Sequence, residues 1–94
     1  MTGAVEALLR ALGPGPIIVE RTASRAWASA EARGERHRLE LRLAGKAAES
    51  LVEGLAEREF ALDRHVVADI AAVVHERNGN EARLVIEALT IALD

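Results

Sequence analysis

The last thirty residues constrain the fold of this chain more than any other segment, because they read as two strands that are apolar on both faces. Asn78-Gly79 separates the two apolar runs, and this dipeptide is typical of a type I′ hairpin turn, whose two central residues need positive φ. In the register set by this turn, one face collects Val66, Ala68, Ile70, Ala72, Val74, Val85, Leu89, Ile91 and Leu93. The other face collects Val67, Ala71, Val73, Leu84, Ile86, Ala88 and Ala92. Both faces are therefore expected to need cover.

The rest of the chain has little material for that cover. Its 94 residues are enough for one domain, residues 1–94, with a marginal core. Half of the residues are hydrophobic, but 19 of them are Ala, which supplies little apolar area. The chain has no Cys, which excludes disulfides and thiolate metal sites as added support. A partner subunit remains as the source of further burial.

An apolar face that spans two strands is larger than soluble monomers usually expose. Closed twofold dimers are the commonest homo-oligomers. The sequence therefore predicts a homodimer that forms through the outer face of the 65–94 hairpin or through an edge strand. The alternative is a sandwich-like closure within one chain, for which the two helices described next leave little polypeptide.

Two segments have the apolar spacing of amphipathic helices. The first is Thr2–Leu12, with Thr2 as its N-cap and Gly13-Pro14 as its end. The second runs from Lys46 to about Arg58, after Gly45. Its inner stripe is Ala48, Leu51, Val52 and Leu55, and its outer side carries Glu49, Glu53 and Glu57. Each helix is expected to pack one apolar stripe against the sheet.

Two strands are predicted between these helices, at residues 17–30 and 36–43. The second alternates with a period of two residues, which is typical of a half-buried strand. One side is His37, Leu39, Leu41 and Leu43, and the other is Arg36, Arg38, Glu40 and Arg42. The element order α-β-β-α-β-β predicts a two-layer α+β fold, in which a four-stranded antiparallel sheet carries both helices on one face.

Gly34 suggests the turn of this central hairpin, because a three-residue loop at 32–34 needs a left-handed residue at its end. Such a loop pairs Trp27 with Leu39 and Ser29 with His37, a pair that we interpret as structural. It also requires a bulge at Ser24-Arg25 to keep arginines out of the core.

Three histidines and Asp69 are the candidate metal ligands. His65, Asp69 and His75 share one predicted strand, where about 3.3 Å per residue separates Asp69 from the histidines by roughly 13 and 20 Å. The ligands of one zinc ion lie about 2 Å from it, so these residues cannot share an ion. The sequence predicts no metal site and no cofactor.

Asp69 is a lone carboxylate within an apolar strand, where an unpartnered carboxylate is costly. We expect it to accept a hydrogen bond from Thr90 or from a residue across the dimer interface, which would fix the register. The alternative is a small cofactorless enzyme or ligand binder, with Asp69 in a pocket beside His37 and Trp27. The candidate ligand or interface residues are Asp69, His65, Thr90, His37 and Trp27.

Positive charge is concentrated in the middle of the chain, whose net charge is −3. Residues 17–46 hold seven basic and four acidic side chains, whereas residues 47–94 hold four basic and ten acidic ones. Arg36, Arg38 and Arg42 are the candidate contacts for an anion such as a nucleic-acid backbone. No aromatic residue lies among them to stack on a base, which disfavours nucleic acid.

No apolar run approaches the roughly 20 residues of a membrane span. The N-terminus has no basic segment followed by an apolar block, as a signal peptide would. With no Cys, these features favour a cytoplasmic protein that does not contact membranes. The sequence thus predicts a small homodimeric domain that works by binding and not by catalysis, with an unknown protein or small molecule as a further partner.

Overall fold

A computed structural model describes residues 3–13, 15–55, 57–60 and 62–93. Its elements follow the predicted order: helix α1 (Gly3–Ala11), strands β1 (Ile18–Ala28) and β2 (Arg33–Ala44), helix α2 (Gly45–Leu55), and strands β3 (His65–Asn78) and β4 (Glu81–Ala92). The predicted N-cap Thr2 and the predicted helix terminator Pro14 lie outside the described residues.

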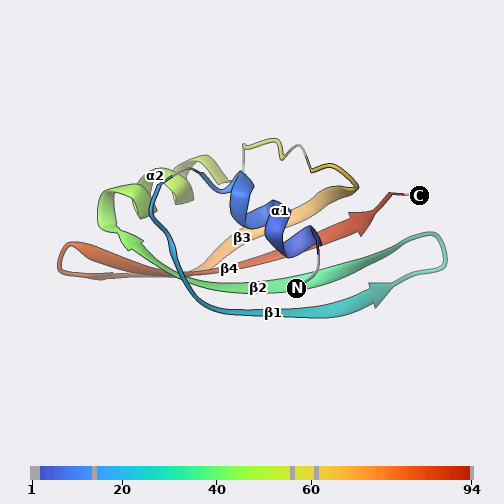
Figure 1. Cartoon of the computed structure of the whole chain (residues 1–94), viewed down its shortest axis with the longest axis horizontal. Coiled ribbons are helices and arrows are strands. Elements are labelled where there is room, and N and C mark those ends of the chain that lie inside the picture. The colour runs from blue at the N-terminus through green and yellow to red at the C-terminus, as the bar shows by residue number, and fades with distance from the viewer. Residues whose placement is uncertain (1–2, 14, 56, 61, 94) are drawn as a thin grey trace.

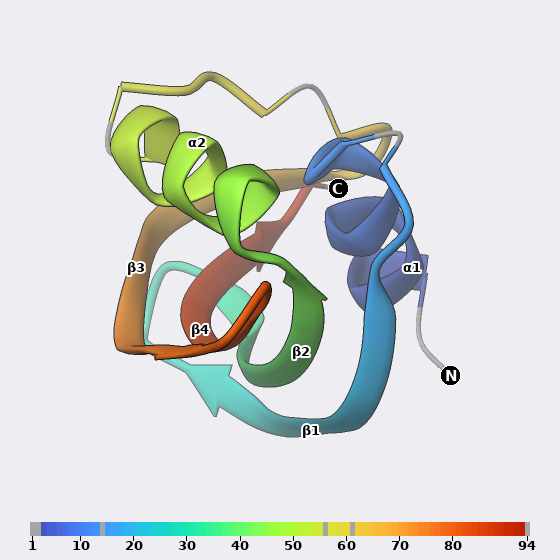
Figure 2. The same ribbon diagram turned by 90° about the vertical axis from the view of Figure 1, so that its left-hand side faces the viewer.

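The four strands form one antiparallel sheet in the order β1-β2-β4-β3, so β1 and β3 are its edges. Both helices lie on the same side of this sheet (Figure 1). Seen along the length of the molecule, the sheet is strongly twisted and coils beneath the helices (Figure 2). The predicted α+β fold is confirmed. We call the helix-covered side the inner face and the opposite side the outer face. Neither described helix has the length and apolarity needed to cross a membrane.

The core lies between the helices and the inner face. The predicted alternation of β2 is confirmed, because Leu39, Leu41 and Leu43 are buried while the arginines between them are exposed. Neighbouring β4 buries Leu84 and Ile86 completely. The helices contribute Val5 and Leu8 from α1, Leu12 from the turn after it, and Ala48, Leu51 and Leu55 from α2. These apolar side chains hold the two layers together.

Helix α2 ends at Leu55, before the predicted end at Arg58. Gly54 is a poor helix former, which favours an early end. Arg58 instead donates hydrogen bonds to the carbonyl oxygens of Ala11 and Leu12, the latter at 3.1 Å from Nη1. These carbonyls belong to the end of α1, where helical partners are missing. Arg58 therefore ties the segment after α2 to α1.

The β1–β2 hairpin has a different register from the predicted one. Ser24, and not Ser29, lies opposite His37, and Trp27 lies opposite Gly34. The turn is formed by Ser29–Ala32: the Ser29 amide donates to the Ala32 carbonyl at 2.8 Å, and Ser29 Oγ accepts from the Ala32 amide at 3.2 Å. Short hydroxyl side chains stabilise turns in this way. Trp27 is therefore on the outer face.

Gly34 has a packing role instead of a turn role. It lies within β2 and does not have positive φ. A Cβ at this position would overlap the main-chain carbonyl of Thr90 in β4. The predicted bulge at Ser24-Arg25 is also wrong, since the irregularity lies between Val19 and Arg21.

The turn of the β3–β4 hairpin is shifted by one residue. Asn78 pairs with Glu81, so Gly79 and Asn80 are the central residues. Gly79 has a φ of 65°, and Asn80 has negative φ. Positive φ at the first central residue alone fits a type II′ turn and not the predicted type I′ turn.

The two faces of β3 also differ from the prediction. Register shifts between Val67 and Asp69 and between Ala72 and Val74 each exchange the faces of the strand. The inner face therefore holds His65, Val67, Ile70 and Ala72, and the outer face holds Val66, Asp69, Ala71 and Val74. The bulges thus pack Ile70 and Ala72 against the core and place Asp69 on the outer face.

Replacement of Gly34 by Ala is expected to destabilise the fold by about 1–3 kcal/mol, because the new Cβ must displace a main-chain carbonyl. Urea unfolding followed by circular dichroism measures the change. Gly54→Ala is the matched control: no atom lies within 4 Å of its added Cβ, and Ala favours the helix. Equal stability of Gly34→Ala and the wild type would contradict the close approach of β2 and β4.

Candidate functional site on the outer face

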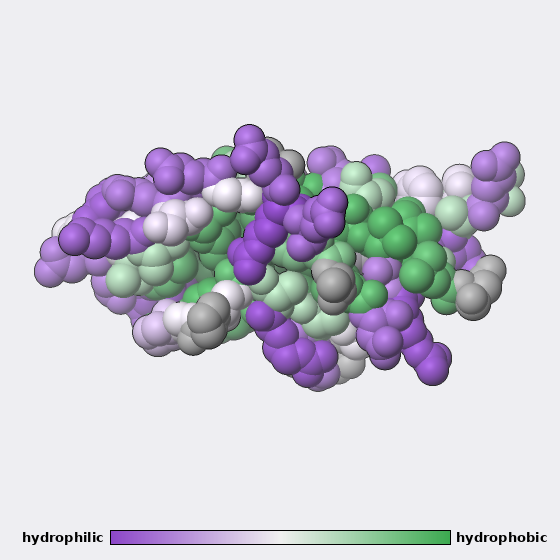
Figure 3. Space-filling view, turned by 90° about the horizontal axis from the view of Figure 1, so that it is seen from above, coloured by the Kyte–Doolittle hydropathy of each residue, from purple (hydrophilic) through white to green (hydrophobic). Residues whose placement is uncertain are grey.

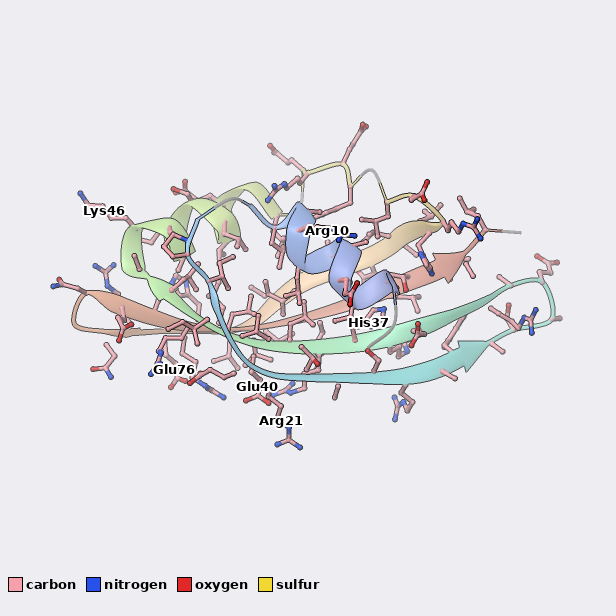
Figure 4. All side chains as sticks on the ribbon, viewed as in Figure 1. Arg10, Arg21, His37, Glu40, Lys46 and Glu76 are labelled. Carbon is pink, nitrogen blue, oxygen red and sulfur yellow. The ribbon has the colours of Figure 1, made fainter. Side chains whose placement is uncertain are left out.

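Ion pairs cover one half of the outer face, toward the β3–β4 turn. Arg83 on β4 bridges Glu40 on β2 at 3.2 Å and Glu76 on β3 at 2.9 Å. The hydrogen bonds that Arg83 donates to Glu76, and next to Glu40, raise the pKa of Arg83. Figure 4 shows Glu40 and Glu76 pointing away from the helices, together with Arg21. Arg38 on β2 makes a further pair with Glu87 at 2.9 Å.

Val85 lies within this charged network. It is on the outer face, opposite Glu40 and Val74, yet it is completely buried. Arg83 and Glu87 precede and follow it on the same face of β4. Long charged side chains can cover apolar surface with their aliphatic stems, which accounts for this burial. The chain therefore shelters part of its own outer face.

The other half of the outer face is only partly covered: Trp27, Leu89 and Ile91 are half-buried. Trp27, Gly34, Ile91 and Val66 lie opposite one another in a row that crosses all four strands. Val66 is 47% exposed, and Leu93, just after β4, is 54% exposed. The helix side, seen in Figure 3, also has apolar surface toward the C-terminal end, so exposed apolar side chains are not confined to the outer face. We call three residues of the row, together with Leu89 from the neighbouring row, the outer apolar patch: Trp27, Val66, Leu89 and Ile91.

A hollow of about 690 Å³ lies beside the outer apolar patch. Its charged lining is Arg25, Arg36, Arg38, Glu87 and Asp69, of which Arg38 and Glu87 form an ion pair with each other. Its apolar lining includes Ala71, Val73 and Leu89. The row of opposed residues across the sheet at this point is Arg25, Arg36, Leu89 and Asp69. The hollow thus has a basic side at β1 and β2 and an acidic side at β3.

His37 belongs to a different cluster, on the inner face beneath α1 (Figure 4). It is 2% exposed, and its Nδ1 and Nε2 are each 2.8 Å from a hydroxyl, of Ser24 and of Thr90 respectively. A hydroxyl both donates and accepts, so the two side chains satisfy either neutral tautomer. Burial lowers the pKa of His37, while Glu35 raises it and His65 lowers it further. The cluster fixes a polar side chain within the apolar layer.

The predicted site residues therefore separate into two groups. His37 and Thr90 come together on the inner face, and His65 also lies there. Asp69 and Trp27 lie on the outer face. Asp69 and His37 both line the hollow, whereas Trp27 is not among its lining residues, so a pocket beside Asp69 and His37 stays a prediction. The predicted bond between Asp69 and Thr90 is wrong, because Thr90 lies on the inner face and bonds to His37. Arg25 was not predicted as a site residue, because its position opposite Arg36 depends on the β1 register.

The predicted anion contacts differ in their surroundings. Arg38 and Arg42 lie beside carboxylates: Arg38 pairs with Glu87, and Arg42 is 4.0 Å from Glu20 and 3.9 Å from Glu81. Arg36 instead lies opposite another arginine, Arg25. The three arginines do not form one continuous basic surface.

Comparison with protein-family models, with curated proteins and with solved structures finds no match for this chain.

The fold is expected to lose stability as the pH falls below about 6.5, the ordinary pKa of histidine. Because the pKa of His37 is lowered, the unfolded chain accepts a proton that the folded chain resists. Its contribution is therefore complete above that pH and declines below it. Urea unfolding at about pH 7.5 and about pH 5.5 measures the loss. In the control His37→Gln, which does not titrate, the loss should be smaller. Identical losses in both chains would contradict the assignment.

Proposed function

We propose that this chain is a small, non-catalytic binding domain that acts in the cytoplasm as a homodimer. In this dimer, the outer apolar patch of one copy packs against the outer apolar patch of the other. The observation that carries the proposal is the row from Trp27 to Val66, which crosses all four strands on the face that bears no helix. Contiguous apolar surface of this kind marks interaction sites in soluble proteins.

A second copy suits this patch because of how the chain itself is built. The core is thin, since many of the hydrophobic residues are Ala, and domains of this size often gain stability from a partner subunit. Pairing through an edge strand is less favoured, because β1 and β3 are both irregular. Bulges on edge strands oppose the addition of a further strand. The face of the sheet is therefore the better interface.

The charges beside the patch also favour a second copy. Arg25 and Arg36 lie toward the β1 edge, and Asp69 lies on the β3 edge. A twofold axis parallel to the strands lays the β1 side of one copy over the β3 side of the other. Arg25 and Arg36 then face the partner's Asp69, and the reciprocal contact forms by symmetry. Unlike charges thus oppose each other on both sides of the apolar patch.

Val66→Glu is expected to weaken the dimer about tenfold or more, because a carboxylate would be buried in an apolar interface. Sedimentation velocity across a range of protein concentrations measures the dissociation constant. Ile18→Glu is the matched control, because Ile18 has a similar exposure of 49% but lies opposite Arg42, in the charged half of the sheet and outside the patch. A wild-type chain that sediments as a monomer at micromolar concentration would refute the proposed function.

Asp69→Asn is expected to weaken the dimer severalfold, and the weakening should shrink as salt is raised, since screening already reduces the contact in the wild type. The same sedimentation series at low and high salt measures both effects. Asp63→Asn is the control, because Asp63 is exposed and lies in the segment before β3. Equal dimer affinity for Asp69→Asn and the wild type at low salt would show that Asp69 lies outside the interface.

A further inference from the structure

The basic side of the hollow is formed by two arginines that oppose each other. Arg25 on β1 and Arg36 on β2 are direct partners in the antiparallel ladder, so both side chains emerge on the outer face. Side chains at such positions start about 5 Å apart, and like charges there destabilise the strand pair. An anion between the two guanidinium groups would remove this repulsion.

The other outer arginines show how this sheet usually compensates positive charge. Arg38, Arg42 and Arg83 each lie within 4.0 Å of at least one glutamate. Arg21 makes no ion pair among the described residues, but it lies opposite a glutamate, Glu40, and not opposite a second arginine. Within the described ranges, neither Arg25 nor Arg36 has a carboxylate within ion-pair distance. Asp69 is in the same row but three strands away from Arg25, about 14 Å at the usual strand spacing. Arg25 and Arg36 are the pair that a ligand would neutralise.

The hollow has the size and lining of a ligand site. Its volume of about 690 Å³ is within the range of small-molecule pockets, roughly 300–1,000 Å³. Leu89 and Ala71 supply apolar lining between the two charged sides. Guanidinium groups bind phosphate and carboxylate through two parallel hydrogen bonds, which gives such a pair its preference for oxyanions.

We propose that Arg25 and Arg36 form a binding site for a small organic molecule that carries a phosphate or carboxylate group. The oxyanion lies between the two guanidinium groups, and the body of the molecule lies over Leu89 and Ala71. Asp69, on the far side, accepts a hydrogen bond from a hydroxyl or amino group of the same molecule. This site goes beyond the proposed dimer, because one chain supplies all of its residues.

The proposed dimer and the ligand compete for the same charges, since the partner's Asp69 approaches Arg25 and Arg36. The test therefore uses the Val66→Glu chain, which keeps the residues of the site and weakens the dimer, at a protein concentration where sedimentation shows it to be a monomer. The probe is inorganic phosphate, titrated at constant ionic strength into isotope-labelled protein and followed through amide NMR shifts. We expect saturable shifts concentrated in residues 23–25, 36–38 and 87–89.

Arg36→Gln and Arg25→Gln, each made in the same Val66→Glu chain, are expected to weaken phosphate binding about tenfold, the size of one charge-assisted contact. Arg10→Gln is the matched control, because Arg10 is exposed on α1, away from the outer face (Figure 4). Unchanged affinity in both Arg25→Gln and Arg36→Gln would overturn the proposal. So would shifts that are linear in phosphate concentration and spread over the whole surface.

A second arm separates a compact site from an extended polyanion surface. A ten-nucleotide single strand is titrated into the same chains, and Arg42→Gln, outside the hollow, is compared with Arg36→Gln. Equal losses of oligonucleotide binding in these two variants, with no saturable phosphate binding, would overturn the proposal in favour of a nucleic-acid surface. If the wild-type chain is already a monomer, the phosphate titration is unchanged, so the dimer and the anion site can fail separately.

Discussion

Packing of the inner-face leucines against the two helices is the interaction on which the rest of this structure depends. Because side chains alternate along a strand, burial of Leu39 and Leu41 sends Arg38 and Arg42 to the outer face. In β4 the same rule buries Leu84 and Ile86 and turns Leu89 and Ile91 outward. The outer face is thus determined by the core, and in β4 it receives apolar residues that the helices cannot reach.

The apolar residues in the two halves of the outer face differ in burial, because the side chains next to them differ in length. Val85 is flanked by Glu40 on β2 and preceded by Arg83, and these long side chains enclose it. Ile91 lies opposite Gly34 on β2, which has no side chain. In the row of residues that follows Leu89 toward the β3–β4 turn, the residues on the edge strands β1 and β3 are Ala23 and Ala71. Side chains this short cannot cover a neighbour. The short neighbours of Ile91 therefore leave the outer apolar patch open, whereas the adjoining hollow is bordered by long arginine side chains.

Elements that depend on local periodicity could be predicted from the sequence. The helical stripes and the alternation of β2 are carried by consecutive residues, so the fold class and the buried face of β2 followed from them. The β1–β2 register did not follow, because two turn signals compete within six residues, and the local hydrogen bonds of Ser29 prevail over Gly34. Gly34 is needed for a contact with Thr90, far along the chain, which no local pattern reveals.

The outer candidate site was predictable only in part, for the same physical reason. Asp69 stands out in the sequence because a carboxylate is rare in an apolar strand, but its face depends on the bulges of β3. Bulges leave no trace in a segment such as Val-Val-Ala-Asp-Ile-Ala-Ala-Val-Val, where either alternation is apolar. Arg25 became part of the site only through the observed register, which places it opposite Arg36.

Exposed apolar surface and arginines without a carboxylate partner occur in the same part of this sheet. Together they indicate a binding surface more strongly than either feature alone. An apolar patch alone is compatible with any nonpolar partner, and two opposed arginines alone are compatible with solvation. Side by side, with Asp69 across the hollow, they define a surface with a basic side, an apolar centre and an acidic side. Exposed apolar side chains and opposed like charges both lower the stability of a fold, so a sequence usually keeps them only at functional sites. In the other half of the outer face, glutamates pair with arginines and their long side chains cover Val85. Such compensation is therefore possible on this sheet, and its absence beside Arg25 and Arg36 is a local feature.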